Sequence, residues 1–538
     1  MKTKKLILLL CLLCSMAVNN AFAYDFAVKN ADGVTIYYNI LNNGKELEVT
    51  HQEDNEGRNS YSGAVVIPQE VTYDNKTLKV TTIGEFAFGS CEEMTSVTIP
   101  NSVITIKEDA FCGCSGLSSV NIPKSVSRID AGAFSGCDNI KSIIVENGNL
   151  VYDCRDNCNA VINRETNALI VGCRNTVILE SVTSIGDKAF DGISTLTSIT
   201  IPNSVTELGY CAFRDTGLTS VIIPNSVTSI GEGAFVLCSN LTSVTIPNSV
   251  TSIEDCAFAC CHNLPSITIP NSVTSLGNNC FDNCWKLSSI TIPNSVKTIG
   301  KSAFDECDNL TSIKLPDGLT CLDYRLFAGC NSLTSITIPE SVESIGEQCF
   351  FSCDHLTSIN LPDGLKSIGD YAFDVCESLS SVTIPESVES IGEKAFYWCF
   401  NLKKIISKIT TPFVIEANTF SDETYSQATL YVPNGTIDKY KATESWKRFK
   451  NIVDEGTTTG IDEVMAQAGD DAVTVKTEGG QLTVAGVADN TVVSVYALDG
   501  ARIGSAISKN GIAVVNTNVA NSTVIVRVGN KSKTVQVR

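Results

Sequence analysis

The sequence contains very little histidine, tryptophan or methionine. Its 538 residues include three His, three Trp and four Met. This composition leaves little material for histidine catalysis, histidine metal sites or aromatic ligand cages. The chain also lacks the G-x-S-x-G, P-loop, G-x-G-x-x-G and H-E-x-x-H motifs of the major enzyme classes. We therefore predict a protein that is not an enzyme and that holds no cofactor and no metal ion.

Basic charge is scarce as well, because 39 Lys and Arg stand against 59 Asp and Glu, a net charge of −20. A nucleic-acid partner requires a basic face, so this class of ligand is not expected. After residue 23, no stretch approaches the ~18 apolar residues that a bilayer-spanning helix needs, so we expect no transmembrane segment. The hydrophobic content of 43% is enough for a packed core.

The first 23 residues are typical of a secretory signal peptide. Lysines among the first five residues precede an apolar run at 6–13 and a small-x-small pattern at 21–23. The mature chain would then begin near Tyr24. Lipid attachment is an alternative because Cys11 and Cys14 lie in the apolar run, although each follows Leu and not the small residue that this modification favours.

An internal repeat of 23 residues is the strongest signal in the chain. Proline recurs at this interval from Pro224 to Pro385, and phenylalanine from Phe235 to Phe396. The longest interval in the series leaves room for one degenerate turn with an insertion at 144–178. The phenylalanine series is extended towards the N-terminus by Phe88, Phe111, Phe134, Phe190 and Phe213.

Within one 23-residue unit, which we call a coil, apolar residues are spaced as in leucine-rich-repeat strands. In a representative coil, Leu241, Val244 and Ile246 follow the L-x-x-L-x-L spacing, and Val250 with Ile253 supplies a second apolar pair.

The next residues, Ala257 and Phe258, are expected to fill the coil interior in a helical turn. One coil cannot bury these faces alone, but stacked coils form a continuous core. The sequence therefore predicts a β-rich solenoid.

Cysteine follows the same period, from Cys238 to Cys399. Side chains at equivalent places in stacked coils are about 4.8 Å apart with parallel Cα–Cβ vectors. A disulfide needs Cβ atoms about 3.5–4.5 Å apart that face each other. We therefore predict that this cysteine ladder consists of buried free thiols acting as small apolar fillers, whereas Cys154 and Cys158 lie off the ladder and are freer to pair. A disulfide framework, common in exported proteins, is the alternative.

The repeated pattern AFxxCxxLTSIxIPxSVxSIG resembles the BspA-like class of leucine-rich repeat proteins, found on the surfaces of Bacteroidota among other organisms. The resemblance implies an N-terminal cap at 24–68, a leucine-rich-repeat solenoid at 69–404 and a C-terminal cap at 405–453. It also implies adhesion, whereas the spacing alone indicates only an extended binding surface.

The C-terminal residues change in character. Residues 454–471 are acidic, lack Lys and Arg, and are predicted to form a linker. Residues 472–538 alternate in short segments, with turn signals at 499–500 and 529–530, which predicts a small β-sandwich. This region resembles the C-terminal sorting domains of the type IX secretion system. A stability or adhesion module is the alternative.

Exposed strand positions provide the candidate binding site. They fall between the buried Val or Ile and the Ile before Pro, and they form a flat, hydroxyl-lined face suited to broad contact with a large partner. Thr is also simply a good strand former, and a template for ordered water is a further alternative. The candidate residues are Thr245, Thr268, Thr291, Lys314, Thr337, Asn360 and Thr383.

Two clusters contain side chains that could support catalysis or metal binding. Cys260-Cys261-His262 could supply a thiolate and a base, but repeats produce such neighbours by chance, and an ordinary turn is the preferred interpretation. Acidic and amide residues at 153–159 could bind Ca²⁺, but they lack the Gly and terminal Glu of an EF-hand loop.

Together these patterns predict an exported protein that adheres to host or bacterial surfaces. It would lie on the cell surface, associated with the outer membrane, or be secreted. Its expected partners are protein or glycoprotein surfaces, including extracellular matrix. The alternatives are a structural scaffold of the cell envelope and an enzyme or inhibitor that uses the 144–178 insertion.

Overall fold

The computed structural model describes residues 24–51, 61–455, 474–478, 481–485, 487, 489–497, 502–510, 512–516, 522–528 and 531–537. The predicted signal peptide, nearly all of the acidic linker and the turn signals at 499–500 and 529–530 lie outside these residues. The chain divides into two compact units, which are described separately. The first comprises Met1–Ile405, Phe413–Ala428 and Thr443–Lys450; the second comprises Ile406–Pro412, Thr429–Ala442 and Asn451–Arg538.

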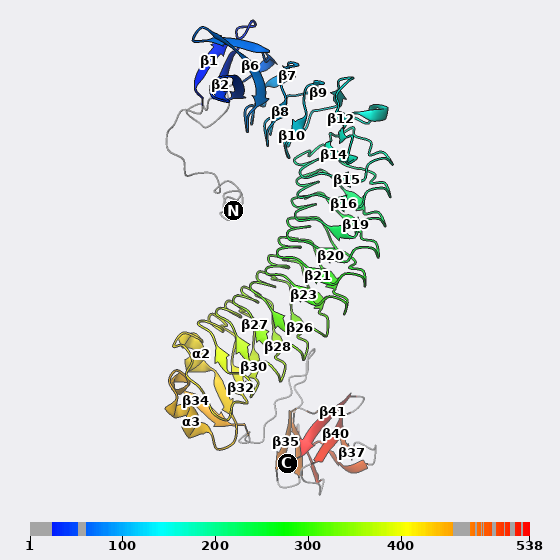
Figure 1. The fold of residues 1–538 in the computed structure, drawn as a ribbon. Coiled ribbons are helices and arrows are strands. Elements are labelled where there is room, and N and C mark those ends of the chain that lie inside the picture. The colour runs from blue at the N-terminus through cyan, green and yellow to red at the C-terminus, as the bar shows by residue number, and fades with distance from the viewer. Residues whose placement is uncertain are drawn as a thin grey trace. The chain divides into compact units, whose positions relative to one another are not determined.

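The first unit opens with a sheet that leads into the coils (Figure 1). Strands β1 and β2 pair antiparallel, as do β2 and β3, while β3 pairs parallel with β6. Strand β6 then pairs parallel with β8 of the first coil, so the sheet covers the end of the stack. The strands of this region are β1 (Phe26–Lys29), β2 (Thr35–Leu41), β3 (Glu46–Thr50), β4 (Gly63–Val66), β5 (Glu70–Tyr73) and β6 (Lys76–Ile83).

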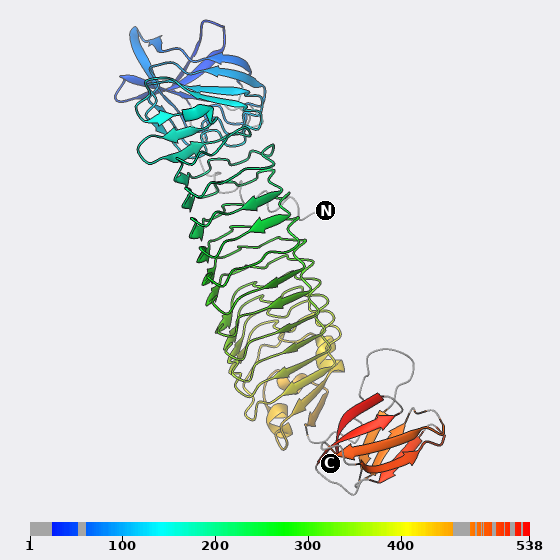
Figure 2. The same ribbon diagram turned by 90° about the vertical axis from the view of Figure 1, so that its right-hand side faces the viewer.

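Each regular coil contributes up to two short strands, and equivalent strands of successive coils pair in parallel (Figure 2). The first ladder precedes the repeated proline. Its strands are β7 (Met94–Thr98), β9 (Ser119–Ile122), β11 (Ser142–Val145), β17 (Ser220–Ile222), β19 (Ser243–Thr245), β22 (Ser289–Thr291), β24 (Ser312–Lys314), β26 (Ser335–Thr337), β28 (Ser358–Asn360), β30 (Ser381–Ile384) and β32 (Lys404–Ser407).

The second ladder follows the proline and is built from two-residue strands. Its strands are β8 (Thr105–Ile106), β10 (Arg128–Ile129), β15 (Ser184–Ile185), β16 (Glu207–Leu208), β18 (Ser229–Ile230), β20 (Ser252–Ile253), β21 (Ser275–Leu276), β23 (Thr298–Ile299), β25 (Cys321–Leu322), β27 (Ser344–Ile345), β29 (Ser367–Ile368) and β31 (Ser390–Ile391). The two ladders and the repeated turns confirm the predicted β-solenoid.

The phenylalanine turn is not helical, so the expected helical turn at Ala257 and Phe258 is wrong. Both residues are fully buried as predicted, but the residues two before and two after the phenylalanine, Cys256 and Cys260, have φ of 55° and 59°. Left-handed residues on both sides keep the chain out of the right-handed helix. The same pair of positive φ values flanks the phenylalanine in the other coils, for example at Arg325 and Gly329.

The phenylalanine rings stack inside the first unit in two runs, from Phe88 to Phe134 and from Phe190 to Phe420. Ring centroids of Phe88 and Phe111 lie 4.9 Å apart at 3°. From Phe190 to Phe420 the successive centroids are 5.1–5.8 Å apart. These stacked rings, together with the buried Leu, Ile, Val and Cys rows, are the core of the solenoid.

The insertion forms a small antiparallel meander whose last strand joins the second ladder. Strand β14 pairs parallel with β15, and the Gly172 N–H donates to the carbonyl of Ala189, the bond that the phenylalanine N–H makes in regular coils. Gly172 therefore occupies the phenylalanine position of a degenerate coil. The elements here are β12 (Tyr152–Asp153), a 3₁₀ turn at Arg155–Asn157, β13 (Val161–Asn163) and β14 (Ala168–Val171).

The segment predicted as a C-terminal cap is shared by the two units. Helix α2 (Asp422–Gln427) and a 3₁₀ turn at Trp446–Arg448 belong to the first unit. Strand β33 (Thr429–Val432), helix α3 (Ile437–Ala442) and strand β34 (Asn451–Asp454) belong to the second, where β33 and β34 pair in parallel.

The second unit also contains the predicted β-sandwich. One sheet has the order β35-β36-β39 and the other β38-β37-β40-β41, and a single apolar cluster with Leu482, Val495 and Val515 draws on both. The strands are β35 (Thr474–Glu478), β36 (Gln481–Ala485), β37 (Val492–Ala497), β38 (Arg502–Ile507), β39 (Ile512–Asn516), β40 (Ser522–Val528) and β41 (Lys531–Val537).

Candidate functional site

The candidate residues share one face of the first ladder, and all of them are exposed. Thr291 is paired in register with Lys314, and Thr337 with Asn360. Their neighbours Ile290 and Ile313 point into the core, with 4% and 8% of their surface exposed, as the two-residue period of a strand requires. We call Thr245, Thr268, Thr291, Lys314, Thr337, Asn360 and Thr383 the strand row.

Several threonine hydroxyls outside the strand row donate to backbone carbonyls of the preceding coil. Thr242 donates its hydroxyl to the carbonyl of Thr219 at 2.9 Å, and Thr251 donates to the carbonyl of Thr228 at 3.1 Å. Equivalent threonines such as Thr357 repeat this bond between coils. Across the described part of the first ladder, no such bond is found for the strand-row threonines. Their hydroxyls are therefore presented to solvent.

A shallow hollow of about 860 Å³ lies in this face between the coils of β19 and β24. It is lined by three members of the strand row and by asparagines that follow the repeated prolines. The lining includes Thr268, Thr291, Lys314, Asn248, Asn271 and Asn294.

Pro265 explains why the hollow lies there. It occupies the position of Thr242 and Ser288, whose N–H groups donate to the preceding coil, and proline has no N–H to donate. In the first ladder, the coil of Pro265 consequently makes only an isolated bridge, Ser266 to Ser289, and no strand. Because the ladder is interrupted, Val244 and Ile246 are only half-buried, whereas the pattern predicts buried side chains.

The exposed groups of the strand row are polar and uncharged apart from Lys314. Hydroxyl, amide and one ammonium group stand on a flat sheet, which suits hydrogen bonding to an extended partner. The face carries none of the Trp, Tyr or Arg side chains that anchor small, tight interfaces, so we expect many weak contacts.

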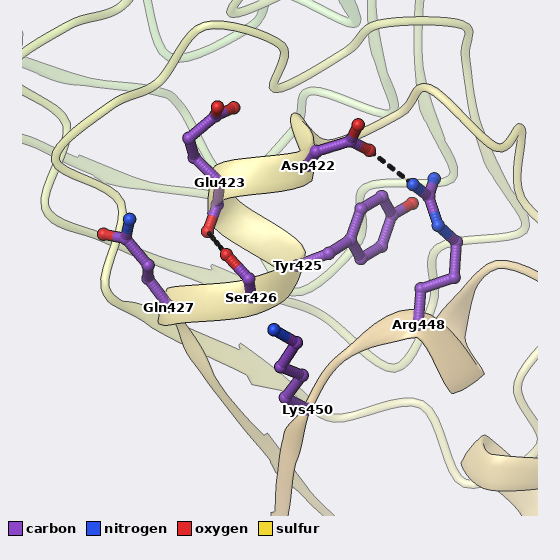
Figure 3. Close-up of a pocket in the computed structure, with 7 residues that line it drawn as sticks. All are labelled: Asp422, Glu423, Tyr425, Ser426, Gln427, Arg448 and Lys450. Atoms are coloured by element: carbon purple, nitrogen blue, oxygen red, sulfur yellow. Dashed lines mark hydrogen bonds and ion pairs between the residues drawn. The ribbon is translucent and has the colours of Figure 1, made fainter.

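A second concavity of about 580 Å³ lies at the C-terminal end of the first unit (Figure 3). Helix α2 carries Asp422 and Tyr425 on one side of it, and Arg448 faces them from the 3₁₀ turn. The guanidinium of Arg448 pairs with Asp422 and lies 4.1 Å from the centre of the Tyr425 ring. Burial raises the pKa of Tyr425 to about 12, although Arg448 opposes the rise. The phenol therefore stays protonated at neutral pH.

In the Cys-His cluster, Cys261 points into the core and His262 stacks on an aromatic ring. The thiol of Cys261 is fully buried and donates to the carbonyl of Phe235 at 3.3 Å, and burial raises its pKa well above the usual value. The ring of His262 stacks on Trp285 with centroids 4.0 Å apart. These contacts are those of an ordinary coil turn.

The insertion shows two notable arrangements. Asp153, considered above for Ca²⁺, pairs with Arg155 at 2.8 Å and with Arg164 at 3.3 Å. The sulfur atoms of Cys154 and Cys158 lie 4.0 Å apart, so these off-ladder thiols are neighbours without being bonded.

Two features are absent from the residues that the structure describes. No group of three or more His, Cys, Asp and Glu side chains there is placed to hold a metal ion. Within the same residues, no helix has both the length and the apolar character that crossing a bilayer demands.

Sequence patterns missed a group of aromatic residues on the last coil. Trp398 and Phe400 are 48% and 46% exposed, and Tyr397 lies beside them half-buried. The available signal was their departure from the repeat, since the matching residues of most other coils are small or polar. Their polar neighbours Asp422 and Arg448 lie outside the repeat and could not be assigned to the same place.

A comparison with family models supplies one match, described as a BspA-type leucine-rich repeat region with six copies. It covers residues 69–160, 162–287, 237–356, 274–403 and 343–444. A comparison with curated proteins found no match.

Several solved structures are similar. A leucine-rich cell surface protein from Faecalibacterium prausnitzii is 26% identical, with 78% of this chain and 98% of that chain covered and a TM-score of 0.41. A leucine-rich repeat protein from Bacteroides ovatus is 28% identical over 71% of this chain and 94% of that chain, with a TM-score of 0.36. The pneumococcal vaccine antigen PcpA is 18% identical over 80% of this chain and 99% of that chain, with a TM-score of 0.35.

Proposed function

Because this chain belongs to the BspA-type leucine-rich repeat family, we propose that it is an exported cell-surface protein whose solenoid mediates adhesion. Its ligands in this proposal are proteins or glycoproteins on host or bacterial surfaces, including extracellular matrix. The strand row is the proposed contact surface.

The observation that carries this proposal is the contrast between the threonine rows. The hydroxyls of Thr242 and Thr251 donate to backbone carbonyls of the preceding coil. These threonines are therefore explained by the contact between stacked coils. The exposed hydroxyl of Thr291 has no such structural task among the described residues, and it repeats along the sheet at the strand row. A row of this kind matches a partner that is itself extended.

Lys314 is the one positively charged residue of the strand row. It is exposed, it borders the hollow beside Thr291, and it stands in a chain of net charge −20. An acidic group on the partner would pair with this ammonium against a background that otherwise repels it. Lys314 is therefore expected to orient the partner on the hollow.

The test is adhesion of the full chain to immobilised basement-membrane extract, mucin and whole bacteria. A triple variant with Thr245→Glu, Thr291→Glu and Thr337→Glu places carboxylates across the strand row and is expected to lower binding strongly. The matched control places three carboxylates at exposed positions on or beside the second ladder, with Thr298→Glu, Thr320→Glu and Ser390→Glu. It should bind as the parent does. Equal losses in both variants, or in neither, would contradict the assignment to this face.

The localisation is tested separately, with the C-terminal β-sandwich proposed as a sorting domain. Intact cells expressing the full chain or a chain ending at Glu463 are treated with protease, and the solenoid is detected by antibody. Loss of surface exposure only in the shorter chain is the expected result. If the full chain is also protected from protease, the protein acts inside the envelope as a structural scaffold.

A further inference from the structure

Among the described coils, the last one alone carries an aromatic residue, Trp398, two positions after its phenylalanine. The residue two positions after the phenylalanine is left-handed throughout, and at Trp398 its φ is 50°. Glycine suits this backbone best, and a bulky side chain suits it poorly. The corresponding residues elsewhere are Ser90, Gly113, Gly136, Gly192, Asp215, Leu237, Cys260, Asn283, Glu306, Gly329, Ser352 and Val375.

Burial of the Trp398 side chain does not offset the unfavourable left-handed backbone, because 48% of its surface remains exposed. Its ring centroid lies 5.4 Å from that of Tyr397, with the planes at 39°, so the two rings form a bent apolar surface. Phe400, 46% exposed, extends this surface. An unfavourable conformation that leaves an aromatic ring in solvent points to a role in binding.

These rings form one wall of a groove of about 500 Å³ that adjoins the concavity of Figure 3. The groove is also lined by polar side chains, which we call the polar wall: Asn418, Asp422, Glu423 and Arg448. Arg448 is held in place by the carbonyl of Ala417, by the carboxylate of Asp422 and by the Tyr425 ring. Phe420, 1% exposed, also lines the groove and continues the second run of stacked phenylalanine rings. The contacts of Arg448 place its guanidinium in the groove.

The shape and chemistry of this groove select a class of ligand. Its volume lies in the range of about 300–1,000 Å³ that is usual for small-ligand sites. A ligand must present an apolar face to Trp398 and hydrogen-bonding groups to Asn418, Asp422 and Arg448. A pyranose ring has both, with C–H groups on its face and hydroxyls at its edge.

The charges that line the groove restrict the class of ligand further. Asp422 and Glu423 outnumber Arg448 on the polar wall, and Glu393 accepts a hydrogen bond from Asn418 behind it. This excess of carboxylates disfavours sialylated and sulfated sugars. A cationic peptide would meet the Lys394 ammonium, which already lies 5.9 Å from the Tyr397 ring centre and repels a second cation at these rings. We propose that the groove of Trp398, Asn418, Asp422 and Arg448 binds a neutral oligosaccharide of hexose or N-acetylhexosamine units.

The experiment uses the full chain and an array of neutral oligosaccharides, followed by calorimetry with lactose, maltotriose, mannotriose and chitotriose. Binding of at least one neutral oligosaccharide is expected, with Trp398→Ala weakening it about tenfold or more. Trp398→Gly should also abolish binding while keeping or raising the melting temperature, because glycine relaxes the left-handed backbone. Retained stability in this variant separates a binding role from a folding role.

Trp285→Ala is the matched control, since Trp285 is another partly exposed tryptophan on a coil turn, covered by His262. It should bind the sugar as the parent does. The proposal is overturned if no neutral oligosaccharide binds, if Trp398→Gly binds as well as the parent, or if 3′-sialyllactose binds more tightly than lactose. The outcome is independent of the strand row, because the adhesion test uses different residues and different partners.

Discussion

Each regular ladder cysteine donates its thiol hydrogen to the phenylalanine carbonyl of the preceding coil. The sulfur-to-oxygen distances are 3.1–3.3 Å, as for Cys114 with Phe88 and Cys307 with Phe281. Burial raises the pKa of Cys307 well above its usual value, so the thiol stays protonated and can donate. None of the described cysteines forms a disulfide, and the ladder thiols act as hydrogen-bond donors as well as apolar fillers.

Replacing Cys307 therefore tests a specific bond. Cys307→Ala removes the donor and leaves a small void, and we expect a loss of about 1 kcal/mol in the free energy of unfolding. Cys307→Ser keeps a donor at the same place and should recover part of this loss. Urea unfolding followed by circular dichroism measures both. A serine variant less stable than the alanine variant would show that the sulfur contributes by packing alone.

Asp282 makes the stability of the solenoid depend on pH. Burial, and secondly the neighbouring carboxylate of Asp305, raises its pKa to about 7, against about 3.9 in an unfolded chain. Between these values the folded chain binds a proton that the unfolded chain does not, so stability rises as pH falls from 8 towards 4. Below pH 4 both states are protonated at this residue and its contribution is constant.

Asp282→Asn should accordingly raise the melting temperature at pH 8, because it removes a buried charge, and the advantage should vanish near pH 4. The control is Asp363→Asn at an exposed turn, which should change the melting temperature little at either pH. Melting curves at a series of pH values give both results. An advantage for Asp282→Asn that persists unchanged at pH 4 would rule out titration as its cause.

At the scale of the element, close approach between coils is set by the glycine that follows most strands of the second ladder, such as Gly300 after β23. A Cβ at Gly300 would lie 2.4 Å from the backbone nitrogen of Asn278 in the preceding coil. Its φ is not in the left-handed region, so steric contact alone requires the glycine. Gly318, in the turn after the repeated proline, differs because the nearest atom to its Cβ would be the Lys297 Nζ at 3.8 Å.

Gly300→Ala is thus expected to destabilise the solenoid by about 1–3 kcal/mol, the usual effect of overpacking. Gly318→Ala should be neutral or slightly stabilising, since alanine has less conformational freedom in the unfolded chain. Thermal melts of the two variants provide the comparison. Similar melting temperatures for both would contradict the contact between coils.

At the scale of the first unit, stability is shared between neighbours along the stack. From Phe213 to Phe396, each phenylalanine contacts the rings one coil before and one coil after it, as Phe350 does with Phe327 and Phe373. Strand pairs also join adjacent coils, as in β27 with β29. The energy of such a stack is close to a sum over coils and their interfaces.

A coil can therefore be removed if the register is kept. Deleting residues 335–357 brings Phe373 to the position that Phe350 had relative to Phe327. The shortened chain should fold with a similar circular dichroism spectrum and a slightly lower melting temperature. Deleting only residues 335–345 breaks the register and should prevent cooperative folding. A folded product from this second deletion would show that the period is not required.

Much of the architecture could be predicted from the repeat, and particular residues show where this stopped. The spacing of Phe258 predicts its buried position correctly. The conformation of its turn was not predictable in the same way, because the two left-handed residues beside it are Cys256 and Cys260, and cysteine does not signal positive φ as glycine does. Pro265 was visible in the sequence, yet the hollow beside Ile246 follows from the hydrogen bond that the neighbouring coil loses. The strand row was predicted as exposed and is exposed.

The sequence by itself determined the period, the solenoid and the rows of buried and exposed side chains, because identical coils repeat identical local patterns and must stack to bury them. Tertiary structure decided whatever depends on atoms of neighbouring coils or of the C-terminal segment. The thiol bond of Cys307 to Phe281 joins two coils, and the groove joins Trp398 to Arg448 across α2. Periodicity gives the place of a residue within its coil, and the partner that it meets is fixed only when the coils close on one another.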